Sequence, residues 1–343
     1  MLEEIREQPA TLERTLRAQR RPMGELRALL ARVRPRLIML AARGTSDNAA
    51  QFGRYLLEIT TGIPVTLAAP SVFTLYNAPF HFEDVLVAAI SQSGESTDTN
   101  VVVQRARDHG ALTIGITNEP ESALAKIAEH VFLVHAGREK SVAATKTYTG
   151  QLLMLYLLAY ALGADIALDD LAWLPEWAAR ALELETEIAR RAERYRFMEH
   201  AVVVGRGLNY ANAFEFALKL METCYVVAER FSSADLAHGP IAMVEASFPV
   251  FLFAPQGVTW PGLREMIGKL VDLKAETLLI TDQGNSAAAA SADRVVTLPI
   301  VLPEIFTPIP YIIPAQLFAA RLAEHKGLDP DRPRTLSKVT RTL

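Results

Sequence analysis

Two stretches of the chain share one pattern: LIMLAARGTSDNAAQFGRYLLE at residues 37–58 and AVVVGRGLNYANAFEFALKLME at residues 201–222. In each, an apolar run typical of a buried strand leads through Arg-Gly into a run with helical periodicity. Arg43 and Arg206 are 163 positions apart. A pattern that recurs at this distance indicates that a whole domain has been duplicated within the chain.

Further segments repeat at or near the same offset. Strand-like runs begin at Val85, Leu112 and Val131 in the first half and at Phe248, Glu276 and Arg294 in the second half. Each half also ends in an apolar helix. Strands that are apolar almost throughout are buried on both faces, as in a parallel sheet covered by helices. We therefore predict an α/β fold with two tandem, doubly wound parallel-sheet subdomains of the flavodoxin-like type.

This interpretation divides the chain into five segments: a helical leader (1–35), a first subdomain (36–165), a connecting helix (166–196), a second subdomain (197–330) and a C-terminal tail over the active site (331–343). The longest uncharged apolar run, Leu152 to Ala164, has 13 residues. A bilayer-spanning helix needs about 20 apolar residues, so this run predicts a buried core helix.

Composition narrows the class of protein. Half of the 343 residues are hydrophobic and 22% are charged, which argues against global disorder. The formal net charge of -4 argues against a nucleic-acid partner. The single cysteine, Cys224, can form no intrachain disulfide, and the N-terminus has no signal-peptide pattern. We expect a cytoplasmic protein with neither a nucleic-acid nor a membrane partner.

A cluster of hydroxyls follows one predicted strand. The sequence ISQSGEST at residues 90–97 holds Ser91, Ser93, Ser96 and Thr97 around Gly94. Ligands of open parallel sheets bind at the carboxyl ends of the strands, where the next helix presents free N–H groups. Capping that helix would need only one or two of these side chains. The cluster therefore predicts an anion site, without the glycine pattern of dinucleotide binding.

The end of the first strand repeats this chemistry. RGTSDNAA at residues 43–50 places Thr45 and Ser46 at the start of a predicted helix. Because the carboxyl ends of parallel strands meet at one edge of a sheet, we expect both side chains to face the same ligand.

Charged side chains supply candidate catalytic groups. Glu215, Lys219 and Glu222 are spaced i, i+4 and i+7, so they share one helix face, although the same spacing is also typical of a surface ion-pair stripe. His238 precedes Gly239-Pro240, a pair that sets a sharp local turn. Lys338 lies six residues from the end, where a solvated tail is the alternative. The seven histidines show no metal-ligand spacing, so we expect neither a metal nor another cofactor.

Six motifs carry a family resemblance: ARGTSDNA, ISQSGEST, SVAATKTYTGQ, EFALKLMET, SADLAHGPIAMVE and PRTLSKVT. They resemble the sugar isomerase (SIS) domains of glucosamine-6-phosphate synthase, also called glutamine--fructose-6-phosphate aminotransferase. They resemble even more the stand-alone glucosamine-6-phosphate deaminases of the same superfamily. The resemblance extends in order over nearly all of residues 35–343.

The resemblance implies roles for individual residues. It implies phosphate binding by Ser46, Ser91, Gln92, Ser93 and Ser96, and sugar contacts by Thr45 and by the segment that holds Val142 and Ala144. It further implies a homodimer with a shared active site, in which His238 of one chain opens the sugar ring in the other. Glu222 would move a proton between C1 and C2, and Lys219 and Lys338 would be active-site lysines.

Two features depart from the synthases. The chain begins MLEEIREQPA, without the N-terminal cysteine nucleophile of a glutaminase domain, and it has Ala144 where the synthase pattern has serine. We therefore expect an enzyme that converts glucosamine 6-phosphate and water to fructose 6-phosphate and ammonia, with no glutaminase domain. The alternatives are a deaminase or deglycase for another phosphosugar, such as galactosamine 6-phosphate or a fructosamine-type conjugate, or a non-catalytic phosphosugar-sensing module.

Overall fold

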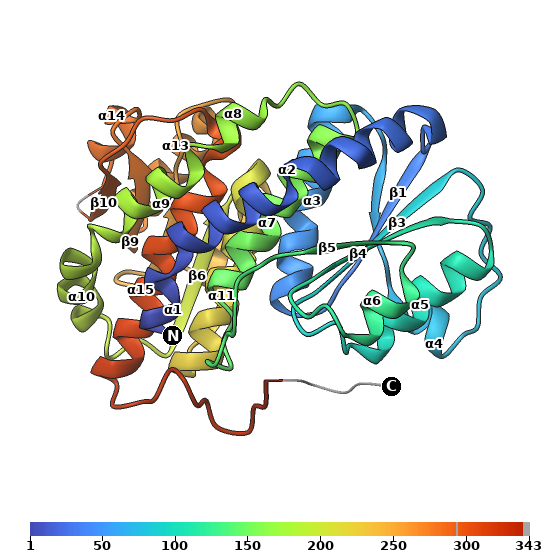
Figure 1. Cartoon of the computed structure of the whole chain (residues 1–343). Helices are drawn as coiled ribbons and strands as arrows, with labels where there is room; N and C mark the ends of the chain where they lie inside the picture. Colours follow the sequence, from blue (N-terminus) through green and yellow to red (C-terminus); the bar gives the residue numbers. More distant parts are fainter. Residues whose placement is uncertain (293, 339–343) are drawn as a thin grey trace. The chain divides into compact units, whose positions relative to one another are not determined.

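The computed structural model describes residues 1–292 and 294–338, which form two compact units (Figure 1). The first-sheet unit comprises residues 7–139, 146–175 and 337–338. The second-sheet unit comprises residues 1–6, 140–145, 176–292 and 294–336. The units follow packing rather than chain order, because a short helix at the start of the chain and the segment at 140–145 both belong to the second-sheet unit.

The first-sheet unit is built on a five-stranded parallel sheet of order β2-β1-β3-β4-β5. Its strands are β1 (Leu37–Ala41), β2 (Val65–Leu67), β3 (Val85–Ser91), β4 (Leu112–Thr117) and β5 (His130–Leu133). Its helices are α2 (Gln8–Val33), α3 (Thr45–Thr61), α4 (Pro70–Thr74), α5 (Thr97–Asp108), α6 (Ala123–Ile127), α7 (Lys146–Ala161) and α8 (Leu168–Leu171).

Helices cover both faces of this sheet (Figure 1). Every residue of β3 is buried, as its apolar run from Val85 to Ile90 predicts, and the strand ends in the buried Ser91. Alternate residues of β1 and β3 pack against α5 and α6 in one core cluster. On the other face, Leu40 lies close to α3 and α7. The predicted core helix is α7, which is buried almost throughout. Among the described residues, the helices lack the combination of length and apolarity that crossing a membrane would require.

The second-sheet unit repeats this plan with a five-stranded parallel sheet of order β10-β9-β8-β6-β7. Its strands are β6 (His200–Gly205), β7 (Val227–Ser232), β8 (Pro249–Phe253), β9 (Glu276–Asp282) and β10 (Val295–Leu298). Its helices are α1 (Leu2–Arg6), α10 (Glu185–Arg194), α11 (Tyr210–Cys224), α12 (Ser233–Ala237), α13 (Trp260–Asp272), α14 (Ser286–Ala289) and α15 (Pro308–His325), with single 3-10 turns η1 (Gly207–Asn209), η2 (Pro240–Met243) and η3 (Glu304–Phe306). Helix α9 (Leu174–Leu182) begins at the end of the first-sheet unit and continues into the second.

An aromatic cluster fills one face of the second sheet. Phe251 of β8 lies 5.1 Å from Phe216 of α11, 5.1 Å from Phe318 of α15 and 5.4 Å from Tyr195, measured between ring centroids. The opposite face packs against α13 and α14. Both sheets therefore have the same strand order relative to the chain, which confirms the predicted pair of α/β subdomains.

The structure also differs from the sequence prediction in detail. Each sheet has five strands, whereas four were predicted in each half. The missed strand β2 has only three residues, and the missed strand β7 is an edge strand that carries the charged pair Glu229 and Arg230. The predicted single connecting helix (166–196) is three helices, α8, α9 and α10, and a turn at Glu183 and Leu184 separates the last two.

Candidate functional site

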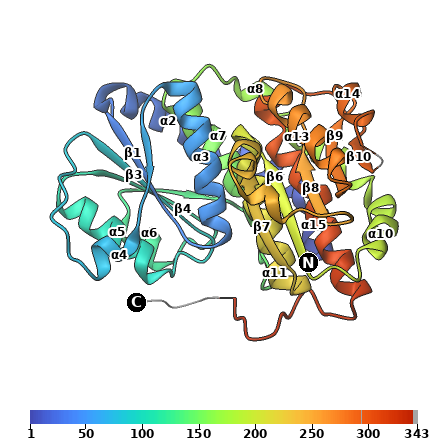
Figure 2. The ribbon, with the colours of Figure 1, turned by 180° about the vertical axis from the view of Figure 1, so that it is seen from behind.

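The carboxyl ends of β1 and β3 form the switch point of the first sheet. These two strands pair directly, with Ala41 opposite Ala89, while β2 extends the sheet on one side and β4 on the other. Helix α3 starts after β1 and helix α5 starts after β3 (Figure 2). Open parallel sheets bind ligands at this point, because the chain leaves the sheet in opposite directions there.

Two helix N-termini meet the loops at this edge. Within the described residues, neither α3 nor α5 is capped by a side chain, although Gly44 and Ser96 occupy their N-cap positions. The Ser96 hydroxyl instead lies 3.1 Å from the Thr99 hydroxyl. The capping alternative for this serine is therefore wrong. N–H groups in the first turn and the positive end of the helix dipole favour an anion here.

Short hydrogen-bonded turns hold the loop after β3 in shape. The Ser91 hydroxyl accepts from the Gly94 amide at 3.1 Å, and the Ser93 hydroxyl accepts from the Glu95 amide at 3.3 Å. Gly94 has φ 64, and a Cβ there would lie 2.2 Å from the Ser122 Oγ. No residue with a side chain fits this position without displacing its neighbour, because both the backbone angle and the space exclude it.

The remaining predicted phosphate ligands lie on the same two strand ends. The Gln92 carbonyl accepts from the Asn118 amide at 3.1 Å, which ties the loop to the end of β4. The buried Ser46 hydroxyl accepts from Gln151 Nε2 at 2.9 Å, and Thr45 is half-buried at the start of α3. We call residues 45–46 and 91–97 the hydroxyl cradle.

An arginine-carboxylate pair links the two sides of the cradle. The Arg43 Nη2 lies 2.7 Å from the Asp98 carboxylate in the first turn of α5. Asp98 is buried and Arg43 is half exposed. Because this pair balances its own charges, an anion in the cradle would be held by hydroxyls and amides rather than by this arginine.

The second-sheet unit holds three of the predicted active-site residues on α11 and after α12. The Lys219 Nζ lies 2.6 Å from Glu222 Oε2 and 3.4 Å from Glu215 Oε1. Side-chain exposure is 1% for Lys219 and 0% for Glu215, but 24% for Glu222. The alternative of a surface ion-pair stripe is therefore wrong. Of the three charged groups, only the Glu222 carboxylate is partly exposed.

His238 is exposed at the C-terminal end of α12. Its amide donates to the Ala234 carbonyl at 3.2 Å, and Gly239 follows with φ 146 before the turn η2. Val142 and Ala144, the predicted sugar contacts, are half-buried in the 140–145 segment of the same unit. The Val142 amide donates to the Asp331 carbonyl at 3.3 Å.

Lys338 makes a specific contact within the first-sheet unit. Its Nζ lies 3.0 Å from Glu139 Oε2, and the same buried carboxylate accepts from the Thr147 hydroxyl at 2.7 Å. The alternative prediction, a solvated tail at Lys338, is therefore wrong. Sequence reasoning missed Glu139, because nothing in the segment GREKS singles out this acid until the distant tail is placed beside it. Residues 339–343 lie outside the described residues, so the predicted covering of the site by the tail stays a prediction.

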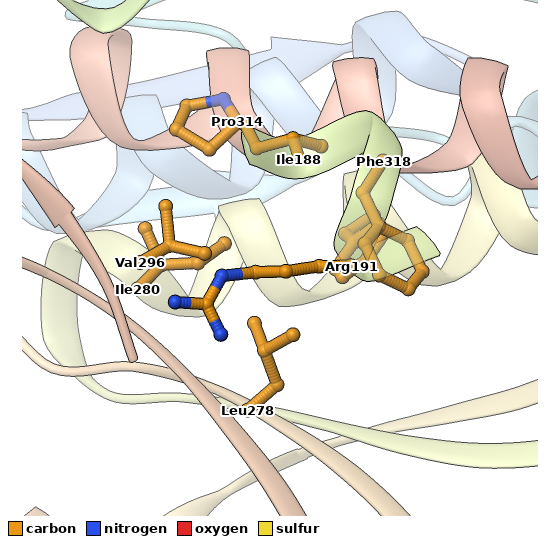
Figure 3. A pocket seen from close by; sticks show the side chains of 8 residues that line it. Ile188, Arg191, Leu278, Ile280, Val296, Pro314 and Phe318 are labelled. Carbon is orange, nitrogen blue, oxygen red and sulfur yellow. The ribbon is translucent and has the colours of Figure 1, made fainter. Parts of the chain in front are cut away.

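An apolar pocket in the second-sheet unit is too small to be the substrate site (Figure 3). It has a volume of about 10 Å³ and is lined by Ile188, Leu278, Ile280, Val296 and Phe318, with the Arg191 side chain across it. That volume holds one water at most. It belongs to the core behind α10 and α15, and we assign it no function.

Comparison with known proteins defines the class. The SIS domain profile matches residues 33–161 and again residues 197–326. The chain therefore belongs to the SIS domain family and contains the domain twice, which confirms the resemblance to SIS domains and the duplication predicted from the sequence.

Individual relatives are more specific. The chain is 36% identical to glutamine--fructose-6-phosphate aminotransferase [isomerizing] of Pyrococcus horikoshii, over 98% of this chain and 57% of the relative. It thus spans little more than half the length of that protein. The solved C-terminal domain of glucosamine-fructose-6-phosphate aminotransferase from Francisella tularensis is 28% identical with a TM-score of 0.87, covering 97% of this chain and 98% of that domain.

A third similarity concerns the fold alone. Glucosamine-6-phosphate deaminase from Thermotoga maritima has a TM-score of 0.76 at 22% identity, covering 97% of this chain and 100% of that one. Together, these relatives show that the chain is close to the isomerase-type region of the aminotransferases and shares its architecture with a deaminase.

Proposed function

We propose that this chain is an amino-sugar phosphate deaminase that converts glucosamine 6-phosphate and water to fructose 6-phosphate and ammonia. The observation that carries the proposal is the state of Glu222. Its carboxylate is partly exposed and is held at 2.6 Å by a lysine that is itself buried. A protein that only senses phosphosugars needs the hydroxyl cradle but has no use for a positioned proton carrier.

In this proposal, the hydroxyl cradle anchors the phosphate. Its serine and threonine hydroxyls, the amides of the loop after β3 and the N-termini of α3 and α5 all favour an anion. Gly94 lets the backbone approach the phosphate closely. A cradle of neutral donors suits a ligand that must bind and leave again in each turnover.

The chemistry proposed for Glu222 is a proton transfer between neighbouring carbons. In the open-chain sugar, Glu222 removes the proton from C2 and returns it to C1, while a proton passes from the amine nitrogen to O1, which converts the C2 amine to an imine and the C1 aldehyde to an alcohol. Water then adds to C2, and ammonia leaves with fructose 6-phosphate as the other product. General acid-base groups in such steps contribute about 10²- to 10⁴-fold in rate. Lys219 positions the carboxylate.

We further propose a homodimer in which His238 of one chain opens the sugar ring bound by the other. Exposure of His238 after α12 supports this role, because the ring is free to reach a neighbouring chain. An imidazole can both accept and donate a proton, as ring opening requires. We assign Lys338 a role at the open-chain sugar, with its amine held by Glu139.

The choice of deaminase over aminotransferase rests on Ala144 and on the motif resemblance. The synthase pattern has serine at this position, and alanine removes its hydroxyl contact. Free ammonia and fructose 6-phosphate would give the reverse reaction through the same groups. In this proposal, the residues around Ala144 select the phosphosugar. The role of Glu222 would be the same for a phosphosugar other than glucosamine 6-phosphate.

The test is direct. Purified full chain is incubated with glucosamine 6-phosphate, and both ammonia and fructose 6-phosphate are measured. We expect both products in equal amounts, and Glu222→Gln should lower turnover by about 10²-fold or more while still binding the phosphosugar. Glu193→Gln, at an exposed position on α10, is the matched control. Phosphosugar binding without any turnover by the unaltered chain would favour the sensing module, and full activity of Glu222→Gln would disprove the assigned base.

A further inference from the structure

The second sheet has a switch point of its own, and a hollow lies there. β6 and β8 pair directly, with β7 and β9 on their outer sides, as β1 and β3 do in the first sheet. Figure 2 shows β6, β8 and the following helix α13. The hollow has a volume of about 300 Å³, and its lining includes Gly262 and the polar side chains of Arg206, Ser233, Thr259, Glu265 and Lys269.

The duplication explains why Arg206 differs from its counterpart. Arg43 is neutralised by Asp98 at 2.7 Å. The offset of 163 that relates Arg43 to Arg206 places Pro261 at the position of Asp98. The arginine is thus retained in the second half, but its acid is replaced. Within residues 1–292 and 294–338, Arg206 forms no ion pair, and its exposed side chain lines the hollow.

Ser233 provides a second, independent observation. It is 6% exposed, lines the hollow, and makes no hydrogen bond through its hydroxyl to any other described residue. The hydroxyl stays accessible from the hollow, so it can hydrogen-bond to a ligand there.

Helix α13 adds its N-terminus to the same wall. Gly262 lies in its first turn, and a Cβ built there meets nothing within 4 Å, so this turn is open. Glu265 pairs with Lys269 at 2.8 Å, and Glu304 accepts from the Thr259 hydroxyl, which leaves its negative charge in place. Arg206 and the positive end of the helix dipole are the groups at the hollow that favour an anion.

We propose that this hollow binds a phosphorylated small molecule of monosaccharide size. A volume of about 300 Å³ is at the lower end for small-molecule sites, which excludes a dinucleotide. The loop itself has lost the hydroxyls of the first sheet, because Ala254 and Gln256 stand where Ser91 and Ser93 do. The site therefore holds its anion through the charge of Arg206, and its affinity falls with ionic strength more steeply than that of the hydroxyl cradle.

Calorimetric titration of the full chain with glucose 6-phosphate at low salt tests this. We expect glucose 6-phosphate to bind at two sites per chain. Glucose, which has no phosphate, should not bind at this switch point. A Ser91→Ala/Ser93→Ala background weakens the hydroxyl cradle, so that the second site is measured by itself. In that background, Arg206→Ala should weaken binding about ten- to hundredfold, as expected for loss of a charge-assisted hydrogen bond, while Arg206→Lys should retain part of it.

Two substitutions at Gly262 form a matched pair that tests the hollow by filling it. Gly262→Glu places an anion in the hollow and should abolish the second site, whereas Gly262→Ala adds only a methyl group in open space and should bind normally. Circular dichroism confirms folding of each variant. Unchanged titration of folded Arg206→Ala and Gly262→Glu would overturn the proposal. The outcome is independent of the proposed deaminase activity, which depends on the other sheet's cradle and on Glu222.

Discussion

Replacing Lys219 on α11 with methionine should show how much its buried charge contributes to stability and how much to turnover. Lys219 and Glu215 are both buried, and their charges lie 3.4 Å apart. Removing one partner of a buried ion pair costs about 3–5 kcal/mol, because the other charge stays in the interior without its counter-charge. We therefore expect Lys219→Met to lower the free energy of unfolding by about 3–5 kcal/mol, a large part of the roughly 5–15 kcal/mol typical of folded proteins.

A second substitution tests the cause of that loss. In Lys219→Met/Glu215→Leu, the uncompensated carboxylate is gone, and apolar side chains of similar size fill the space. Such replacements are often neutral or stabilising. The double variant should regain most of the lost stability. Turnover should stay low in both variants, because Glu222 no longer has the ammonium group at 2.6 Å that positions it.

Urea unfolding followed by circular dichroism gives the free energies, and the ammonia assay gives turnover. The slope of the free energy against urea should stay unchanged, so that midpoints can be compared. If Lys219→Met were as stable as the unaltered chain, the buried pair would not matter for stability. If the double variant were as unstable as the single one, the loss would come from packing rather than from the buried charge of Glu215.

Two further predictions concern the partner chain and the single cysteine. Glu222→Gln and His238→Ala chains should each be inactive, yet activity should return after the two are mixed and subunits exchange; no recovery despite proven exchange would contradict a shared site. Burial raises the pKa of the Cys224 thiol to about 11. Because the thiol then stays protonated at pH 8, a thiol reagent should modify the native chain slowly and the urea-unfolded chain fast, and rapid native modification would contradict its burial.

The sequence predicted the features that local physics decides. Strands that are apolar almost throughout, such as β3, require cover on both faces, and the repeat of Arg43 at Arg206 revealed two copies of one plan. The hydroxyl cluster at residues 90–97 could be placed at a strand end, because that position follows from the order of strand and helix. Edge strand β7 escaped prediction, since its exposed face carries charges that break the apolar pattern.

Only the tertiary structure decided which polar groups are paired with one another and which remain accessible to a ligand. Helical periodicity placed Glu215, Lys219 and Glu222 on one face, but it could not tell whether that face meets solvent or core, because burial depends on what packs against the helix. The pair of Lys338 and Glu139 joins residues 199 positions apart, a distance at which sequence pattern carries no information about contact. Burial of α11 and the return of the tail are properties of the assembled fold, and they decide which charges remain available for chemistry.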